Sequence, residues 1–333
     1  MTKKIEKDSS EQEQFISFVL PVYNEKDNLQ ELYDRITKIM KTQTYRYELL
    51  FIDDGSSDDS FDVLKEIYKK DIRVRVIQFR RNFGKAAAYN AGFQNAKGDI
   101  IITMDTDLQD EPEEIPLFID KMKEGFDLVT GWKHEGKGPL TKSLPSKIFN
   151  RVVSFITGIR IHDFNCPFKA YRKEVLKEIE IYGELHRYIP VLARSKGFSI
   201  AEIKIKNLPR KYGQSKYGIE RFIRGMLDLL TVIFITRFAK RPLHFLGIGG
   251  LFSSLAGLAI LLFYICAHFL YKAGILISRG WNIHDRPAIS LGLLLMIVGI
   301  QFFSIGLIAE LIVSSKRISL SDSGYTIRKV LGD

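Results

Sequence analysis

Acidic residues recur in short polar segments, each of which follows an apolar run typical of a β-strand. Asp53 and Asp54 follow the second run, and Asp105 and Asp107 follow the fourth. Neighbouring carboxylates repel one another unless a cation or a set of hydrogen-bond donors faces them. The oxygen-rich segment from Asp105 to Gln109 suits a hard divalent cation that also binds diphosphate oxygens. These residues predict metal-assisted chemistry on a phosphate-containing substrate. Simple capping of the following helices is the alternative, mainly for Asp58 and Glu113.

Strand and helix patterns alternate through the first part of the chain. We expect strands at 15–22, 47–52, 74–79, 99–104 and 126–131, and helices at 25–40, 57–70, 85–96 and 112–123. This alternation predicts a mostly parallel, doubly wound sheet. Ligands bind such sheets beyond the carboxyl ends of the strands, where the acidic segments lie.

Two aliphatic blocks, 243–271 and 288–313, lie near the end of the 333 residues. Each is long enough to cross a bilayer as a helix. Glu310 is the one Lys, Arg, Asp or Glu residue in either block, and it lies one turn from the end of the second. The chain is therefore predicted to be anchored in a membrane, where an enzyme domain would act on a lipid-soluble substrate.

Basic residues flank the predicted spans and contribute to a net charge of +10. Arg237 and Arg241 precede the first span, and Lys316 follows the second, which predicts that both termini lie in the cytoplasm. Lys272 and Arg286 in the intervening loop weaken this inference. The two cysteines indicate no disulfide framework, and the polar N-terminus lacks a signal-peptide core.

Two amphipathic stretches, 146–156 and 219–238, fit helices that lie in the headgroup plane, although core packing is the alternative for the shorter one. Between them, residues 207–218 form a basic segment with glycines and a hydroxyl. Such a segment could bind a lipid phosphate, or anionic lipid in general. Glycine and serine in the first span allow close helix packing, so we expect a homo-oligomer, with a tetramer as one candidate size.

Four ordered motifs carry a resemblance to a known family: residues 21–25, 52–58, 81–85 and 105–109. They resemble the inverting family-two glycosyltransferases of GT-A fold, in particular the polyprenyl-phosphate enzymes related to dolichyl-phosphate mannose synthase and to bacterial undecaprenyl-phosphate glucosyltransferases. The motifs cover about residues 15 to 220. The resemblance implies an α/β fold with a GT-A-type, Rossmann-like mixed sheet that has helices on both faces. Interfacial helices and a two-helix transmembrane hairpin would follow.

We expect six segments on this basis. They are a polar tail (1–14), the GT-A domain (15–216), a juxtamembrane amphipathic helix (217–241), two transmembrane helices (242–272 and 287–313) and a cytoplasmic tail (314–333).

The resemblance also implies roles for individual residues. Nucleotide-sugar contacts would come from Pro21, Tyr23, Glu25, Asp53, Asp54, Lys85, Asp105 and Thr106. Asp105, Asp107 and Gln109 would hold Mg²⁺ or Mn²⁺, and Asp107 and Asp163 would be catalytic. Lys133, Lys142, Ser146, Arg210, Ser215 and Lys216 would bind the acceptor phosphate. Four points stay open.

Lys85 could instead be a solvated surface lysine, and Asp163 could orient the acceptor instead of removing a proton. Pro167 stands where glycine is common in the family, which puts the loop geometry in doubt. His186 and Arg187 either line the same cleft or form a pair on a helix surface.

The expected reaction transfers glucose from UDP-glucose to undecaprenyl phosphate at the cytoplasmic face of the inner membrane. GDP-mannose as donor, a processive polysaccharide synthase and a non-catalytic scaffold are the alternatives. The synthase is disfavoured because the Gln-x-x-Arg-Trp motif and further spans are missing from the sequence. The expected partners are the nucleotide sugar, the lipid phosphate, the bilayer and a separate flippase. No nucleic-acid partner is expected.

Overall fold

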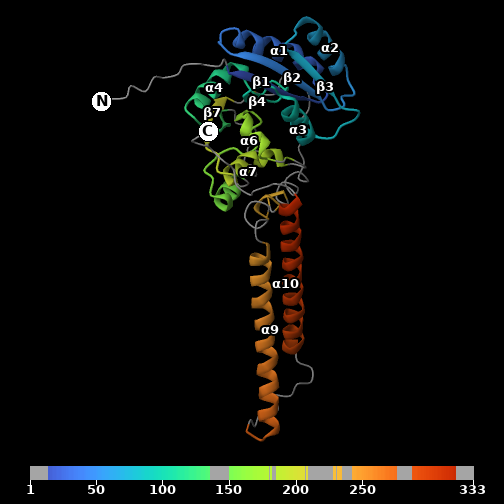
Figure 1. Cartoon of the computed structure of the whole chain (residues 1–333), viewed down its shortest axis with the longest axis vertical. Helices are drawn as coiled ribbons and strands as arrows, with labels where there is room; N and C mark the ends of the chain where they lie inside the picture. Colours follow the sequence, from blue (N-terminus) through green and yellow to red (C-terminus); the bar gives the residue numbers. More distant parts are fainter. Residues whose placement is uncertain are drawn as a thin grey trace, which may run out of the picture. The chain divides into compact units, whose positions relative to one another are not determined.

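The computed structural model describes residues 14–135, 150–179, 181, 185–206, 208, 228–229, 231–234, 242–275 and 287–319. The chain forms two compact units, Met1–Val232 and Ile233–Asp333. Figure 1 labels their helices and strands.

A seven-stranded mixed sheet forms the centre of the first unit, with the order β3-β2-β1-β4-β6-β5-β7. Its strands are β1 (Phe15–Val22), β2 (Arg46–Asp53), β3 (Val74–Gln78), β4 (Ile100–Thr103), β5 (Leu128–Glu135), β6 (Lys169–Arg172) and β7 (Ile200–Lys206). Among these strands β6 alone runs in the opposite direction, because it pairs antiparallel with both β4 and β5. The carboxyl ends of β1, β2 and β4 therefore lie side by side at one edge.

The helices follow the strands along the chain. They are α1 (Lys26–Met40), α2 (Ser60–Lys70), α3 (Lys85–Asn95), the 3₁₀ turn η1 (Pro112–Glu114), α4 (Ile115–Lys123), α6 (Lys173–Lys177), the 3₁₀ turn η2 (Leu185–Tyr188) and α7 (Ile189–Ser195). Residues 150–157 are also helical, within the predicted stretch 146–156 and one residue beyond it.

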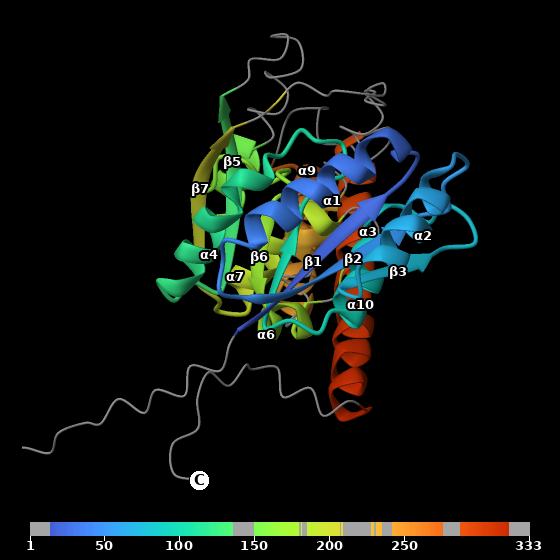
Figure 2. The ribbon, with the colours of Figure 1, turned by 90° about the horizontal axis from the view of Figure 1, so that it is seen from above.

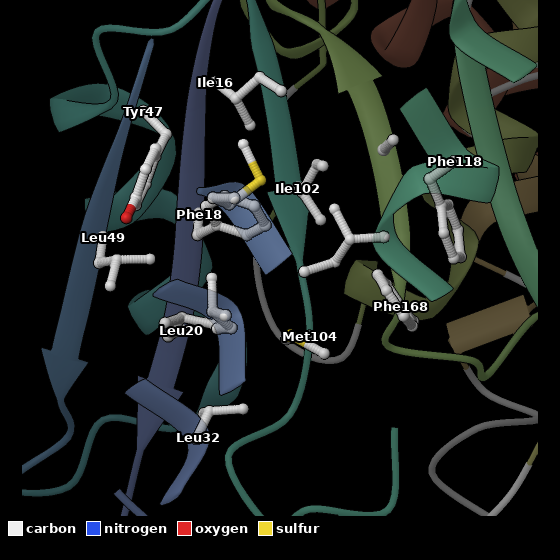
Figure 3. Close-up of a cluster of buried hydrophobic side chains, with 14 of the residues drawn as sticks. Ile16, Phe18, Leu20, Leu32, Tyr47, Leu49, Ile102, Met104, Phe118 and Phe168 are labelled. Atoms are coloured by element: carbon white, nitrogen blue, oxygen red, sulfur yellow. The ribbon is translucent and has the colours of Figure 1, made fainter. Parts of the chain in front are cut away.

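Helices α1, α2 and α4 cover one face of the sheet (Figure 2). Side chains at alternate positions of β1, such as Phe18 and Leu20, point to this face because successive residues of a strand face opposite sides. They pack with Leu32 of α1 and with Phe118 of α4 in one apolar cluster (Figure 3). Burial of this cluster is the main contribution to the stability of the fold.

Helix α3 packs on the other face. A Cβ atom built on Gly92 would lie 2.3 Å from Cγ1 of Val19 in β1, so the absence of a side chain permits this close approach. The ring of Tyr171 in β6 lies edge-on to Phe93, with the ring centroids 5.7 Å apart. Helices on both faces confirm the predicted fold class.

The expected strands and helices up to residue 131 are found within one or two residues of the expected ends, with two exceptions. Helix α2 begins at Ser60, three residues later than expected, and β5 runs from Leu128 to Glu135. The sequence reading missed β6 and β7. Strand β6 has only four residues and begins with a lysine, so it carries no apolar run. Strand β7 does alternate, as IAEIKIK, and this period was a usable signal.

The second unit contains two long helices, α9 (Pro242–Lys272) and α10 (Pro287–Ser319). Both are long and apolar enough to cross a membrane, judged by length and composition. Their small residues face each other: a Cβ on Gly250 would lie 2.5 Å from the carbonyl oxygen of Gly299. Ser253 Oγ donates a hydrogen bond to Leu295 O at 2.8 Å.

The small residues from which we predicted a homo-oligomer thus pack between α9 and α10 of the same chain. Gly249 differs, because a Cβ on it would meet no atom within 4 Å. Glu310 also turns inward, since its carboxylate accepts the backbone N–H of Leu243 in the first turn of α9 at 3.3 Å.

Candidate active site

Most of the predicted nucleotide-sugar residues line one pocket of about 240 Å³ at the carboxyl edge of β1, β2 and β4. It is lined by Pro21, Val22, Tyr23, Glu25, Asp54, Asn82, Gly84, Lys85, Ala88, Asp105, Thr106 and Asp107. The strand order explains this gathering, because the three acidic segments follow neighbouring strands.

Hydrogen bonds join the loops that follow β1 and β2. The Asn24 N–H donates to Ser56 Oγ at 3.0 Å, and the Ser57 N–H donates to Asn24 Oδ1 at 2.8 Å. Asp53 lies below them, fully buried, and its Oδ1 accepts the Ser56 N–H at 3.0 Å. Within the described residues its Oδ2 has no hydrogen-bond partner. A buried carboxylate oxygen without a partner is costly, which suits a ligand that donates a hydrogen bond.

Asp54 holds the loop that leads into α3. Its two oxygens accept the backbone N–H groups of Phe83 at 2.7 Å and of Gly84 at 2.9 Å. Burial raises the pKa of Asp54 above its ordinary value, although the two donors oppose this effect. The next residue, Gly55, has φ of +68° and leaves no room for a side chain against the backbone of Arg81. Asp54 therefore shapes one wall of the pocket.

The segment after β4 forms a tight turn. Thr106 Oγ1 donates to the carbonyl oxygen of Pro21 at 3.0 Å, which fixes this segment to the end of β1. Leu108 has φ of +58°, an uncommon conformation for a bulky side chain. The turn lets the Gln109 N–H donate to Asp107 Oδ1 at 3.1 Å. A non-glycine residue held in this region is strained, and such strain often accompanies functional sites.

Lys85 is the first residue of α3, and its ammonium forms an ion pair with Asp105 Oδ1. Both side chains keep about 30% of their surface exposed, at 30% and 29%. Burial raises the pKa of Asp105, but the charges of Lys85 and Lys133 outweigh it, so the pKa is lowered. Lys85 therefore lies at the pocket in an ion pair with Asp105, and its contact with the nucleotide sugar stays a prediction.

Asp110 and Lys133 form an ion pair that the sequence reading did not anticipate. Lys133 Nζ lies 2.8 Å from Oδ1 of Asp110, whose side chain is fully buried. Asp110 Oδ2 accepts the Asp105 N–H at 3.3 Å. Burial lowers the pKa of Lys133, but the charge and hydrogen bond of Asp110, together with the charge of Asp105 and the nearby Cys166, raise it above its ordinary value. The pair joins the end of β5 to the turn that follows β4.

Asp163 lies in the segment that precedes β6, close to the same charges. Burial raises its pKa, against the positive charges of Lys169 and Lys133. Lys169 is itself buried, and its ammonium donates to the carbonyl oxygens of Phe164 and Cys166. Thr103 Oγ1 in β4 donates to Pro167 O at 2.7 Å. Pro167 thus fits a loop that is tied to the strand before Asp105.

The structure describes only part of the predicted acceptor group. Lys133 is described, whereas Lys142, Ser146, Arg210, Ser215 and Lys216 lie outside the described residues, as does most of the stretch 219–238. His186 and Arg187 are buried at 8% and 7% exposure, so the helix-surface alternative for this pair is wrong. His186 lies against Tyr89 of α3, with the ring centroids 5.9 Å apart.

The protein-derived ligands at this edge do not make a complete metal site by themselves. In the part of the chain that the structure describes, no three His, Cys, Asp or Glu side chains meet as a metal-binding group. Asp105 and Asp107 supply carboxylates at the pocket, and Gln109 is next to them in the turn. A Rossmann-like mixed sheet with such a segment at its carboxyl edge fits the class predicted from the sequence, a nucleotide-dependent transferase of GT-A type.

Comparisons with known proteins agree with this class. The family model "Glycosyl transferase family 2" matches residues 17–180. The dodecaprenyl-phosphate galacturonate synthase of Rhizobium johnstonii is 34% identical over 323 residues, which cover 96% of this chain and 93% of that protein. The undecaprenyl-phosphate 4-deoxy-4-formamido-L-arabinose transferase of Shewanella sediminis is 36% identical over 299 residues, which cover 90% and 87%.

Among solved structures, glucosyl-3-phosphoglycerate synthase from Mycobacterium tuberculosis in complex with Mn²⁺ and UDP-glucose has the same fold. The TM-score is 0.52 at 17% identity, over 67% of this chain and 79% of that chain. The chain belongs to glycosyl transferase family 2 and is a glycosyltransferase.

Proposed function

We propose that the chain transfers a sugar, with inversion, from a UDP-sugar to the phosphate of a polyprenyl lipid. The pocket that gathers Tyr23, Lys85, Asp105 and Asp107 at one sheet edge carries this proposal. Relatives named for transfer to dodecaprenyl or undecaprenyl phosphate support it, because they match nearly the whole chain.

The nucleotide would bind between the loops after β1 and β2. The Tyr23 ring is 38% exposed at the pocket and can pack against a base. Asp53 Oδ2, which has no hydrogen-bond partner among the described residues, could accept a hydrogen bond from an N–H group of the base. Asp54 would act by holding the loop of Phe83 and Gly84 in place.

We propose Asp105, Asp107 and Gln109 as ligands of Mg²⁺ or Mn²⁺. Two carboxylates and an amide oxygen are hard donors, and the diphosphate of the donor would complete the set. When bound, such a cation offsets the negative charge that develops on the departing diphosphate. Lys85 brings a further positive charge to the same edge of the pocket.

The acceptor needs little activation by the protein. A phosphate monoester loses its second proton near pH 6, so its oxygen is already an anion at neutral pH. This oxygen would form the bond to the anomeric carbon while the bond from that carbon to the UDP oxygen breaks. Asp163 would orient the acceptor or take its last proton, and the predicted acceptor cations, from Lys133 to Lys216, would bind its charge.

The sugar is a separate question. Glucose is the donor expected from the sequence, whereas the named relatives transfer galacturonate and 4-deoxy-4-formamido-L-arabinose. We therefore place UDP-galacturonate and UDP-4-deoxy-4-formamido-L-arabinose beside UDP-glucose as candidate donors, with GDP-mannose as the test of a different nucleotide.

The two apolar helices α9 and α10 support a membrane association. We propose that both termini and the active site are cytoplasmic, because nucleotide sugars are made there and basic residues flank the spans. A homo-oligomer and a separate flippase for the product remain proposals from the same reasoning.

The test is transfer of radiolabelled sugar from each donor into the organic phase, with undecaprenyl phosphate and Mg²⁺ or Mn²⁺. We expect label in lipid for one donor, and its loss with chelator and with Asp107→Ala. Asp120→Ala is the matched control, because Asp120 is 68% exposed on α4 and pairs only with Lys123 in the described contacts. If a folded protein binds UDP but labels no lipid from any donor, the lipid acceptor is wrong.

A further inference from the structure

Glu202 in the middle of β7 makes three contacts with one short segment of the chain. Its Oε1 accepts the backbone N–H groups of His162 at 2.8 Å and of Asp163 at 3.2 Å. Its Oε2 lies 2.7 Å from Nδ1 of the His162 ring. The Glu202 side chain is only 13% exposed. Hydrogen bonds to an ionised acceptor are stronger than those between neutral groups, so this carboxylate is a firm anchor.

Asp163 depends on such an anchor because it lies in no helix or strand. Its own carboxylate accepts the Asn165 N–H at 3.0 Å, which shapes the turn but does not attach it to the sheet. Beyond Asp163 along the chain, Lys169 Nζ donates to the carbonyl oxygen of Cys166 and Thr103 Oγ1 donates to that of Pro167. Glu202 is thus the attachment on the side of Asp163 itself.

The same contacts reach the strand that carries Lys133. The ring of His162 stacks on Trp132 of β5, with the ring centroids 3.9 Å apart and an angle of 11° between the planes. Lys204 of β7 lies over the same indole, 5.3 Å from its centroid. The next residue after Trp132 is Lys133, which pairs with Asp110. Through these contacts Glu202 fixes Asp163 relative to β5, the strand that carries Lys133 of the predicted acceptor group.

We propose that Glu202 is a positioning residue that holds Asp163 in place for the acceptor phosphate. The inference rests on the proposed function, in which Asp163 contacts that phosphate. Glu202 itself touches no substrate. Its effect should therefore appear in the turnover of the acceptor and be absent from the binding of the nucleotide, which occupies the other end of the sheet edge.

The experiment compares Glu202→Ala, Glu202→Gln and Asp127→Asn in the full-length protein in lipid nanodiscs. Asp127 is the matched control, because it also joins β5 to the start of β7: its Oδ2 accepts both the N–H and the hydroxyl of Ser199 at 2.7 Å. It lies at the opposite end of the strand pair. UDP affinity, thermal unfolding and the kinetic constants for undecaprenyl phosphate are measured for each variant.

We expect Glu202→Ala to lower kcat/KM for the lipid by about 10²-fold, as a displacement of about 1 Å does in other enzymes. Glu202→Gln keeps an oxygen that accepts both N–H groups, so about tenfold or less should be lost. UDP affinity should stay within about twofold throughout. Asp127→Asn should lower the unfolding temperature but leave kcat/KM within about threefold.

A double-mutant cycle completes the test. In an Asp163→Asn background, Glu202→Ala should cost less than about threefold more, because its target is already gone. An undiminished effect in that background overturns the proposal, as does an equal loss of turnover in Glu202→Ala and Asp127→Asn at equal loss of stability. If the wild type binds UDP but transfers no sugar to lipid, the proposed function fails first, and the inference fails with it.

Discussion

Replacement of Gly55 by alanine tests how the nucleotide pocket is built. Gly55 follows Asp54 in the loop after β2 and has φ of +68°. A Cβ atom at this position would lie 2.4 Å from the carbonyl carbon of Arg81 and 2.7 Å from the backbone nitrogen of Asn82. These are backbone atoms, so no side-chain rotation can relieve the contact.

The expected magnitude has two parts. An alanine with positive φ costs about 1 kcal/mol or somewhat more, and overpacking adds about 1–3 kcal/mol. An ordinary contact also requires the loop of Arg81 to move by about 1 Å, and a misplacement of that size can cost about 10²-fold in function. This loop carries the N–H groups that Asp54 binds and leads into Lys85, so its movement should weaken UDP binding.

Gly125→Ala is the control for strain alone. Gly125 has φ of +97°, and a Cβ there would meet no atom within 4 Å. Thermal unfolding and UDP titration calorimetry with Mg²⁺ are compared for the two variants. We expect both to lose stability, but only Gly55→Ala to lose UDP affinity, by about 10- to 100-fold. Equal UDP affinities in the two variants would refute the close approach of the two loops as a determinant of the pocket.

Further predictions concern charge and packing. Lys133→Met leaves Asp110 buried without its cation and should lower the free energy of unfolding by about 3–5 kcal/mol. Addition of Asp110→Leu to this variant should restore part of the loss, and urea denaturation measures both effects. Hydrogen bonds lower the pKa of Asp71 to about 2 from 3.8, so the stabilisation that this carboxylate provides is present above pH 4 and is lost as the pH falls toward 2. Asp71→Asn should therefore cost at most about 2 kcal/mol in the free energy of unfolding at pH 7. In acid titrations of stability, the difference between wild type and variant should shrink below pH 4. Gly250→Leu should separate α9 from α10 and cost about 1–3 kcal/mol, whereas Gly249→Leu, at an open position, should not, which thermal unfolding in detergent can check.

Much of the candidate site could be predicted because its residues follow strands. Apolar runs mark β1, β2 and β4, and parallel neighbours bring their carboxyl ends together, so Tyr23, Asp54, Asp105 and Asp107 were expected at one edge and line one pocket. Their roles in binding and catalysis remain predictions. The partners of these residues were less accessible: Asp110 was visible in the sequence three residues after Asp107, yet nothing nearby indicated that Lys133 would pair with it.

Hydrophobic period is a local property of the chain, so the sequence was enough to locate the strands and helices up to residue 131 and the two apolar spans, but not β6 and β7. The sequence also determined the order of the acidic motifs. Only the tertiary structure decided that β6 enters between β4 and β5, and that β7 joins the far edge. These pairings place Lys133 on Asp110 and Glu202 on the segment of Asp163. Such contacts join residues far apart in the sequence, and they arise from packing across the whole sheet, for which no short stretch of sequence carries a signal.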